Sequence, residues 1–256
     1  MLPILLYDNR LNDGALDVTS TAAGFNVLNL KNLRAYTFWK ATNNATQYIV
    51  VDCGSEKTAD CLAILGHNLG SIGATVTLQS SADNFNPSVN DAFAGVAVTS
   101  DRIFFKEFAA PVARRYWRLK IDGASAAPQI AVLMFGNKLQ FPYPPETPFP
   151  PYEESVETDT KRSKAGHLLG SVVRYFPRKM EARFTTLSRD FVFNTYKPFW
   201  EGHASLMKPF FFGWDLDAYP DQVLFGKVPD SAVYKSPLSR SGYVDEIVLQ
   251  MEGMRE

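Results

Sequence analysis

Few residues of this sequence have types and spacings that could support chemistry. Its three histidines, His67, His167 and His203, lie far apart, and none forms an HExxH pattern or joins Cys and Asp at the spacing of a metal site. His67 lies in the turn 66–70, where His and Asn tolerate unusual backbone angles. We interpret all three as turn or packing histidines rather than ligands or bases, and we predict no metal site.

The tightest pair of carboxylates beside an aromatic residue is Asp215 and Asp217, which follow Trp214. Two acids near a tryptophan are compatible with glycoside hydrolysis. The surrounding stretch 213–221 has the composition of a solvated turn between strands, and we prefer that interpretation. The aromatic run 210–214 could be a stacking platform, but a buried strand is the simpler interpretation.

Oxygen ligands for calcium could come from Asp83, Asn90 and Asp91, although their spacing fits no EF-hand and Asx residues near proline commonly form turns. The glycine patterns of nucleotide sites do not occur in the sequence, and the loop 70–73 precedes no predicted helix that could bind phosphate. The sequence therefore predicts no catalytic residue and no cofactor, and we expect that the chain is not an enzyme. It leaves calcium open and does not identify the residues that bind a ligand.

The chain contains two cysteines, Cys53 and Cys61. A disulfide framework for a secreted domain normally needs more of them, and a zinc site would need further Cys or His ligands nearby. We predict two buried free thiols that pack as small hydrophobic groups, and the sequence leaves their pairing open.

The composition is that of an ordinary globular protein, with 46% hydrophobic and 21% charged residues over 256 positions, enough for two domains. The formal net charge is −1 and the sequence has no basic run, so nucleic acid is not an expected partner. The apolar start 1–7 lacks a basic region and does not have the pattern of a signal peptide. No apolar run approaches the ~18 residues of a membrane-spanning helix, so we expect no membrane partner and synthesis in the cytoplasm.

Short runs with strand character recur between turn signals before residue 140. In the run 115–121, Tyr116, Arg118 and Lys120 share one face, and the apolar residues between them share the other. Many short strands at this spacing predict a sandwich or a jelly roll. The predicted strands are 48–52, 61–66, 74–79, 103–108, 115–121 and 130–135.

The clearest internal boundary is the segment 141–151, in which six of eleven residues are proline. Such a segment cannot form a helix or a central strand and acts as a semi-rigid spacer. We therefore predict a first domain at 1–140, a proline-rich linker and extended arm at 141–164, and a second domain at 165–256.

The second domain is predicted to be a β domain with one helix, so that the whole chain is all-β in class. Runs 172–176 and 180–185 indicate a hairpin. Ser188 is a candidate N-cap for a helix near 188–204. The apolar face of this helix would contain Val192, Tyr196, Phe199, Trp200 and His203, and further strands are predicted at 209–214, 223–228 and 244–252.

Residues 30–140 resemble the discoidin, or galactose-binding-like, jelly roll. The resemblance rests on Trp39-Lys-Ala41 and on the segments 48–54, 59–69, 76–81 and 113–121, with Cys53 where the family usually has Leu. It implies the fold but identifies no binding residue, because this fold carries sugar, lipid and protein binders. We interpret Trp39 and Trp117 as core residues rather than sugar platforms.

Residues 155–254 resemble, more loosely, distal tail proteins and related tail-hub domains of siphophages. The resemblance rests on an extended arm, a strand pair, the Phe184-Thr-Thr-Leu-Ser-Arg-Asp helix start, and the strands near 208–215 and 242–253. It implies a tail-tube-like β domain that self-associates as a ring, commonly a hexamer, between the tail tube and the baseplate hub. The arm would reach a neighbouring subunit, or it would simply join the two domains.

The resemblances imply a structural component of a bacteriophage tail tip, located in the virion and carrying an outward sandwich that could contact a host-surface glycan. The alternative is a carbohydrate-binding module protein without catalysis. An aromatic side chain exposed in a loop of the first domain would favour this alternative. Titratable groups that converge in one pocket would instead favour an enzyme.

Overall fold

The computed structural model describes residues 2–109, 112–239 and 242–255. Residue 1 of the predicted first domain and residue 256 of the predicted second domain therefore lie outside the described residues. The chain divides into two compact units. The sandwich unit contains Leu5–Leu139 and Leu216–Val223. The arm unit contains Met1–Ile4, Gln140–Asp215 and Leu224–Glu256.

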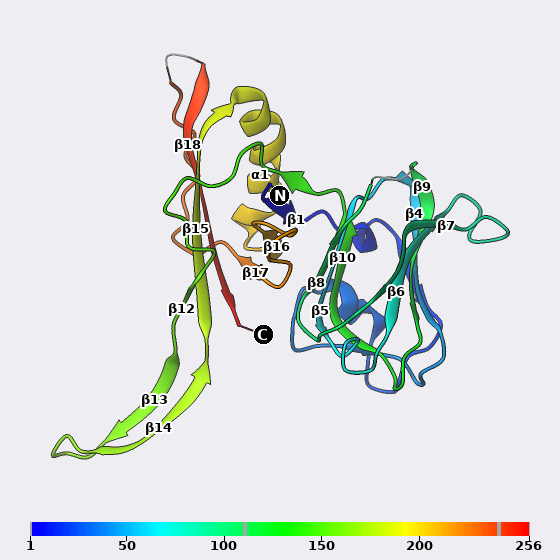
Figure 1. Ribbon diagram of the computed structural model, residues 1–256, viewed down its shortest axis with the longest axis horizontal. Coiled ribbons are helices and arrows are strands. Elements are labelled where there is room, and N and C mark those ends of the chain that lie inside the picture. Colours follow the sequence, from blue (N-terminus) through cyan, green and yellow to red (C-terminus); the bar gives the residue numbers. More distant parts are fainter. Residues whose placement is uncertain (1, 110–111, 240–241, 256) are drawn as a thin grey trace. The chain divides into compact units, whose positions relative to one another are not determined.

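The sandwich unit is built from two antiparallel sheets (Figure 1). Neighbours in each sheet are mostly distant in sequence, as in a jelly roll, and the predicted jelly-roll β-sandwich is confirmed. The first sheet has the order β2 (Ala15–Val18), β4 (Gln47–Lys57), β9 (Arg114–Asp122), β6 (Thr75–Ser81), β7 (Asn90–Ala97). The second sheet has the order β3 (Trp39–Lys40), β10 (Gln129–Gly136), β5 (Cys61–His67), β8 (Phe104–Glu107), and two 3-10 turns lie at Arg10–Asn12 and Val27–Lys31.

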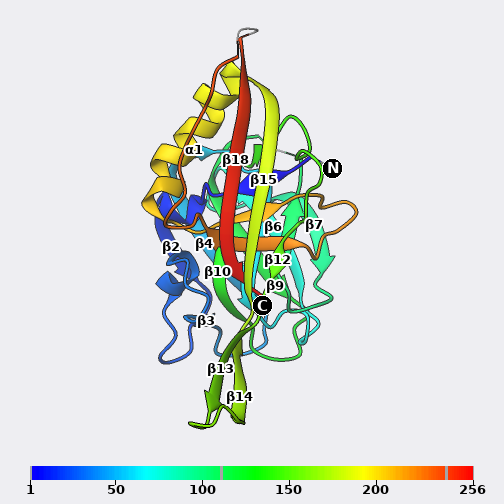
Figure 2. The same cartoon turned by 90° about the vertical axis from the view of Figure 1, so that its left-hand side faces the viewer.

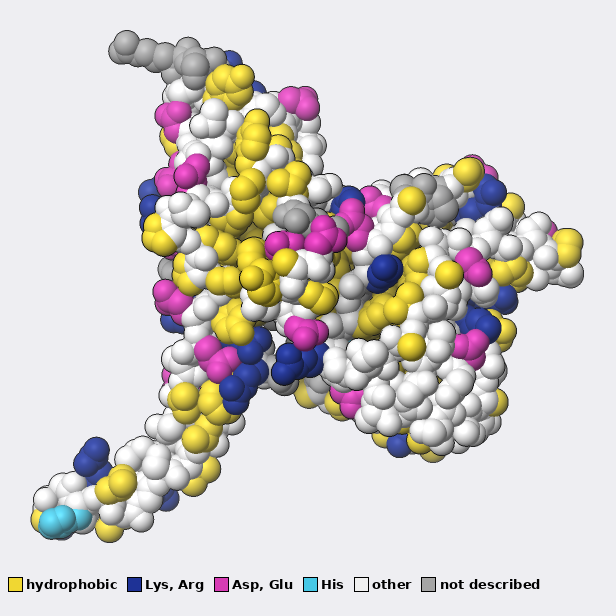
Figure 3. All heavy atoms as spheres, in the orientation of Figure 1, with side chains coloured by type: hydrophobic (Ala, Val, Ile, Leu, Met, Phe, Trp, Pro, Cys, Tyr) yellow, Lys and Arg dark blue, Asp and Glu magenta, His cyan; other side chains and the backbone are white. Residues whose placement is uncertain are grey.

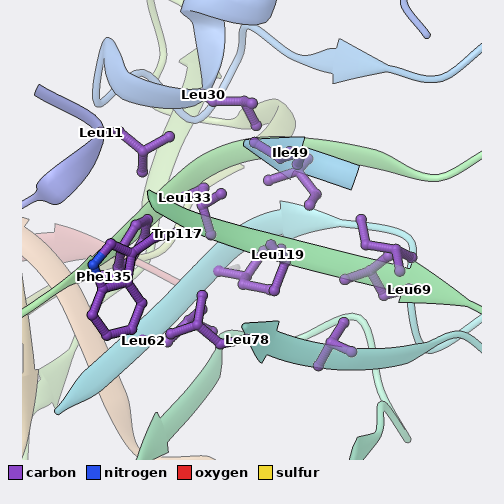
Figure 4. Packing of buried hydrophobic residues seen from close by; sticks show 14 of the residues in the cluster. Leu11, Leu30, Ile49, Leu62, Leu69, Leu78, Trp117, Leu119, Leu133 and Phe135 are labelled. Carbon is purple, nitrogen blue, oxygen red and sulfur yellow. The ribbon is translucent and has the colours of Figure 1, made fainter. Parts of the chain in front are cut away.

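Apolar side chains from both sheets meet in the core between them (Figure 4). On β9, Trp117, Leu119 and Ile121 are buried in this core, while the residues between them lie on the outer side, as the alternation predicts. Trp39 and Trp117 are fully buried, which confirms their interpretation as core residues. Their indole N–H groups donate to the backbone carbonyls of Ser20 and Arg114, each at 3.1 Å, so neither indole is left unsatisfied.

Cys53 and Cys61 are free and buried, as predicted. Burial raises the pKa of the Cys53 thiol to about 11. Burial likewise raises the pKa of Cys61. Because the thiolate is the reactive form, both side chains are inert packing groups at neutral pH.

The arm unit is built on a seven-stranded sheet. Two long strands dominate it, since β15 (Pro177–Ser188) pairs with β18 (Tyr243–Met254) along nearly its whole length (Figure 2). The sheet order is β11 (Leu139–Gln140), β1 (Ile4–Leu6), β16 (Phe210–Gly213), β17 (Val223–Lys227), β18, β15, β12 (Glu153–Glu154). The chain passes from one unit to the other within β1 and β11, at one edge of the sheet, and again on either side of the segment Leu216–Val223.

The predicted helix is present in the arm unit. It begins after Ser188, whose hydroxyl accepts the backbone N–H of Phe191 at 3.2 Å. Pro198 lacks the N–H that would bond to the carbonyl four residues earlier, and the turns before it are π-helical rather than α-helical. The helical segments are Phe191–Tyr196 (π), α1 (Lys197–Gly202) and a 3-10 turn at Ala204–Leu206. The predicted apolar face is buried except at Trp200, which is half-buried.

The predicted hairpin between 172–176 and 180–185 is wrong. Both strands exist, but β14 (Leu168–Tyr175) pairs with β13 (Glu157–Arg162), and β15 pairs with β18. The chain stays extended through Phe176 and Pro177 instead of turning. Residues 153–162 of the predicted arm form β12 and β13.

The alternation on β9 gives a stability prediction. Leu119→Ala removes a fully buried side chain from the central strand of the first sheet, so we expect the free energy of unfolding to fall by about 2–5 kcal/mol. Lys120→Ala, one residue further, removes an outer ion pair with Asp122 and should cost no more than about 1 kcal/mol. Urea unfolding of both variants, followed by tryptophan fluorescence, measures this difference. Equal costs would contradict the burial of Leu119.

Candidate functional site

The outer face of the five-stranded sheet brings polar and aromatic side chains together from four strands. On β9, Arg118 lies opposite Val50 of β4 on one side and opposite Gln79 of β6 on the other. Gln79 in turn lies opposite Asp91 of β7. One row across the sheet thus places a guanidinium, an amide and a carboxylate side by side, because paired residues of neighbouring strands point to the same face.

Hydrogen bonds hold this row in one arrangement. Nε of Arg118 donates to Oε1 of Gln79 at 2.7 Å, and Nε2 of Gln79 donates to Oδ1 of Asp91 at 2.7 Å. The orientation of the Gln79 amide is determined by these partners, since its oxygen must face the donor and its nitrogen the acceptor. Gln79 therefore separates the guanidinium from the nearest carboxylate of the row.

Two aromatic rings flank the same guanidinium. Cζ of Arg118 lies 4.4 Å from the centroid of the Tyr48 ring and 4.1 Å from that of Phe85. Each contact has the geometry of a cation–π interaction. We refer to Tyr48, Gln79, Phe85, Asp91 and Arg118 as the Arg118 cluster.

Phe85 reaches the cluster from the loop between β6 and β7, which extends away from the sandwich in Figure 1. Asn84 and Phe85 have φ of 56° and 64°, in the left-handed region that a bulky side chain rarely adopts. The hydroxyl of Ser81 accepts the Phe85 N–H at 2.9 Å and donates to the Asp83 carboxylate at 2.6 Å, which holds the loop. Backbone strain of this kind is concentrated at functional sites.

The neighbouring cations on this face are neutralised. Arg115 makes two hydrogen bonds to Asp52, at 2.6 and 2.7 Å. Lys120 pairs with Asp122 at 2.5 Å. Arg118 forms no ion pair with any residue that the structure describes.

Two pKa shifts on this face have clear causes. The Arg115 hydrogen bonds, helped by the Gly54 backbone N–H, lower the pKa of the Asp52 carboxyl to about 2. Partial burial lowers the pKa of the Arg118 guanidinium, although a guanidinium remains charged in proteins.

The histidines considered as site residues lie in three different elements. His67 is buried at the end of β5, where its Nδ1 accepts the Leu69 backbone N–H at 3.2 Å. His203 is buried after α1, with Nε2 at 2.9 Å from the Pro209 carbonyl oxygen. His167 lies in the exposed turn between β13 and β14.

The carboxylates considered for chemistry are also dispersed. Asp215 and Asp217 lie in the turn region after β16. Asp83 accepts from the hydroxyl groups of Ser81 and Ser88, and Asp91 accepts from Gln79. Within the described ranges, no group of three or more His, Cys, Asp or Glu side chains is placed to hold a metal ion.

The outer face could be predicted from the sequence, but the Arg118 cluster could not. The alternation at 115–121 placed Tyr116, Arg118 and Lys120 on one side of a strand, and the structure confirms it. No local signal connected Arg118 to Tyr48, Gln79 or Phe85, because those residues come from other strands and a loop.

A second surface belongs to the arm unit. The strands β13 and β14 with their turn form a two-stranded hairpin, which we call the hairpin arm, and every residue of both strands is exposed. Figure 3 shows hydrophobic side chains along it. The exposed apolar residues on or beside it are Val156, Leu168, Leu169, Val172, Val173 and Tyr175.

The charges of the hairpin arm are distributed unevenly. Lys161, Arg162 and Lys164 lie around its turn, and the sequence has no acidic residue between Asp159 and Glu181. A groove of about 710 Å³ beside β15 and β18 of the same unit is rich in acidic residues. Its charged lining consists of Glu146, Glu153, Glu181, Glu252, Lys179 and Arg183.

Several solved structures are similar to about half of the chain. Chitosan-binding module 1 from a chitosanase/glucanase of Paenibacillus sp. IK-5 is 20% identical, with a TM-score of 0.41, over 50% of this chain and 98% of that one. CBM32 of AlyQ, in complex with 4,5-unsaturated mannuronic acid, is 21% identical, with a TM-score of 0.41, over 51% and 96%. A Clostridium perfringens CBM32 domain in complex with GalNAc-β-1,3-galactose is 16% identical, with a TM-score of 0.41, over 52% and 99%.

Other comparisons give no family assignment. No protein-family model matches the chain, and no curated protein matches its sequence. Among the helices that the structure describes, none has the length and apolar character needed to cross a membrane.

The Asp52–Arg115 pair gives a pH prediction. We expect the Asp52 carboxyl to titrate with a pKa of about 2, so the stability it contributes is present above its unfolded-state pKa and lost as the pH falls through about 2. Arg115→Gln removes the largest cause and should raise this pKa towards the ordinary value. Arg114→Gln, a matched control on the adjacent residue, should leave it unchanged, since Arg114 donates to the Ala113 carbonyl instead. Carboxyl ¹³C NMR titration measures the Asp52 pKa in the unmodified chain and in both variants. An unchanged pKa in Arg115→Gln would contradict Arg115 as the cause of the shift.

Proposed function

We propose that this protein is a non-catalytic binding protein whose sandwich unit recognises a saccharide on the outer face of its five-stranded sheet. The observation that carries this proposal is the Arg118 cluster, a guanidinium flanked by two rings on the outer side of the sheet. The side chains of this face suit binding rather than turnover, since a nucleophile paired with a base is not among them.

A saccharide presents an apolar ring face together with many hydroxyl groups. Aromatic rings provide large rigid contact area, and planar amide and carboxylate groups provide directed hydrogen bonds. The outer face offers both kinds of group, with Tyr48, Tyr116 and Phe85 near the exposed Asp91. The buried Gln79 holds Arg118 and Asp91 in place. Register and hydrogen bonds hold these groups in place before a ligand arrives, which reduces the entropy cost of binding.

A further aromatic side chain favours saccharide binding. Tyr36 is 74% exposed and lies in the loop that precedes β3 of the sandwich unit. An exposed loop aromatic of this domain is a feature expected of a carbohydrate-binding module.

The proposal predicts saccharide binding that depends on the face. The full chain should bind at least one ligand of a glycan array, and Tyr48→Ala with Tyr116→Ala should weaken that binding about tenfold or more, as the loss of two aromatic contacts would. Tyr143→Ala, an exposed tyrosine of the arm unit, is the matched control and should have no effect. Binding that is lost only in Tyr36→Ala would place the site in the loop instead. A chain that binds no saccharide would overturn the proposal.

The second candidate function is a structural subunit of a multi-copy assembly, which the hairpin arm favours. An isolated two-stranded hairpin is marginally stable in water, and contiguous exposed apolar side chains mark interaction surfaces. The finer proposal, a ring of the bacteriophage tail tip between tube and hub, rests on the resemblance of residues 155–254 alone.

A second copy of this chain is the partner that this candidate requires. The basic turn of the hairpin arm complements the acidic groove of the arm unit. An arm that binds the groove of the next copy makes a heterologous contact, which closes into a ring when the rotation permits. The sandwich unit would then be carried on the ring as its binding module.

Solution mass tests this candidate. Light scattering should find several copies of the full chain. Replacing residues 156–175 by Gly-Gly should give monomers, because it removes the hairpin arm. The rest of the sheet should still fold, since β12 and β15 pair without the arm. Reversing the charges of Lys161, Arg162 and Lys164 should also give monomers, and reversing Glu146 and Glu153 in the same chain should restore the assembly. A full chain that is monomeric at all concentrations, or an assembly that survives the deletion, contradicts self-association through the arm.

A further inference from the structure

Arg118 is a cation at the centre of the outer face whose charge is left available. Arg115 and Lys120 are each paired with a carboxylate, whereas Arg118 has no ion pair among the described residues. The Asp91 carboxylate that could have neutralised it is bound to the Gln79 amide instead. An arrangement needed only for stability would be satisfied by a direct ion pair.

The donors of the Arg118 guanidinium are used unequally. Only its Nε–H makes a hydrogen bond to another described residue, the one to Gln79. The two Nη groups keep their donors, and these form the planar fork that matches a carboxylate with two parallel hydrogen bonds.

The two flanking rings keep the fork rigid and partly dry. With Tyr48 and Phe85 at 4.4 and 4.1 Å from Cζ, the guanidinium cannot turn freely towards the paired acids of the face. Hydrogen bonds between charged groups are stronger where water is partly excluded. The strained loop that holds Phe85 contributes to this arrangement.

We infer that the saccharide recognised by this face is acidic and that its carboxylate is bound by the Nη groups of Arg118. This inference rests on the proposed function, since it specifies the class of saccharide at the same site. The sugar ring would lie against the neighbouring aromatic side chains, with Asp91 accepting from its hydroxyl groups.

The surrounding charges favour an isolated carboxylate over a polyanion. Asp52 and Asp122 add no net charge to the face, because each is paired with a cation, whereas Asp91 is bound to a neutral amide and would repel a densely charged chain of phosphates or sulfates. A carboxylate and the guanidinium fork are both planar, so the two can meet in one plane through two parallel hydrogen bonds.

Matched ligands test the inference. The probes are tetragalacturonate, tetramannuronate and sialyllactose, each compared with its methyl ester by isothermal titration calorimetry on the full chain. Dextran sulfate is the sulfated probe, because it carries sulfate groups and no carboxylate. We expect at least one acid to bind about tenfold or more tightly than its ester, as the loss of a charge-assisted hydrogen-bond pair implies. Dextran sulfate should bind more weakly than that acid.

Variants of Arg118 identify the group responsible. Arg118→Met keeps an apolar stem and removes the fork, so it should lower the affinity for the acid to that for the ester, and Arg118→Lys should restore it only in part. Arg102→Met is the matched control, an exposed arginine elsewhere in the sandwich unit, and should change nothing. In the unmodified chain, the Arg118 Nη signals in ¹⁵N NMR should shift with the acid and not with the ester, which tests the contact without a variant.

The outcomes separate this inference from the proposed function. Neutral saccharides that bind as well as the acids, with Arg118→Met unchanged, would overturn the inference and leave saccharide binding in place. If Arg118→Met weakens the binding of the acid and of the ester by the same factor, Arg118 only supports the aromatic rings. That result would also overturn the inference. Dextran sulfate that binds as tightly as the acid would overturn the preference for a carboxylate. A chain that binds no saccharide would overturn the proposed function itself.

Discussion

The alternation of side chains along β9 is the constraint on which the sandwich unit depends. This strand pairs with β4 on one side and β6 on the other, so its inner residues lie in the middle of the core and its outer residues in the middle of the exposed face. Trp117, Leu119 and Ile121 provide the apolar burial. The same period of two places Tyr116, Arg118 and Lys120 on the other side. A shift of one residue in register would exchange core and surface at once, and it is therefore strongly opposed.

This constraint connects stability to binding. Because the core determines the register, Gln79 and Asp91 take their places beside Arg118 without any cost specific to the site. The loop after β6 then adds the one strained element, the left-handed backbone at Phe85, which places a ring on the guanidinium. A rigid sheet with one adapted loop is a common way of building a preorganised site.

The arm unit uses long strands for a different purpose. The pairing of β15 with β18 buries Met180, Ala182 and Phe184 on one face, and the ring of Phe141 stacks on Phe184 with centroids 3.8 Å apart. The chain before β15 has no such burial, and it continues as an exposed two-stranded arm. The hairpin arm therefore concentrates apolar side chains that the unit itself does not cover. This exposed apolar surface is the physical basis for expecting a partner there.

The strands β2, β3 and β7 of the sandwich were not predicted from the sequence. Its local patterns were sufficient to predict the other strands of the sandwich, its buried tryptophans, the free thiols, and the helix after Ser188 with its apolar face. Each of these depends on residues close together in the chain, because burial of one side of a strand or helix leaves a periodic trace in its own segment. Only the tertiary structure decided which strands pair. By its pattern, the run 172–176 could pair with the segment before it or with the strand after it. It pairs with β13, which was not predicted as a strand. The Arg118 cluster could not be predicted for the same reason. Its members come from β4, β6, β7, β9 and a loop. Their contacts depend on the register between distant segments, which no single segment encodes.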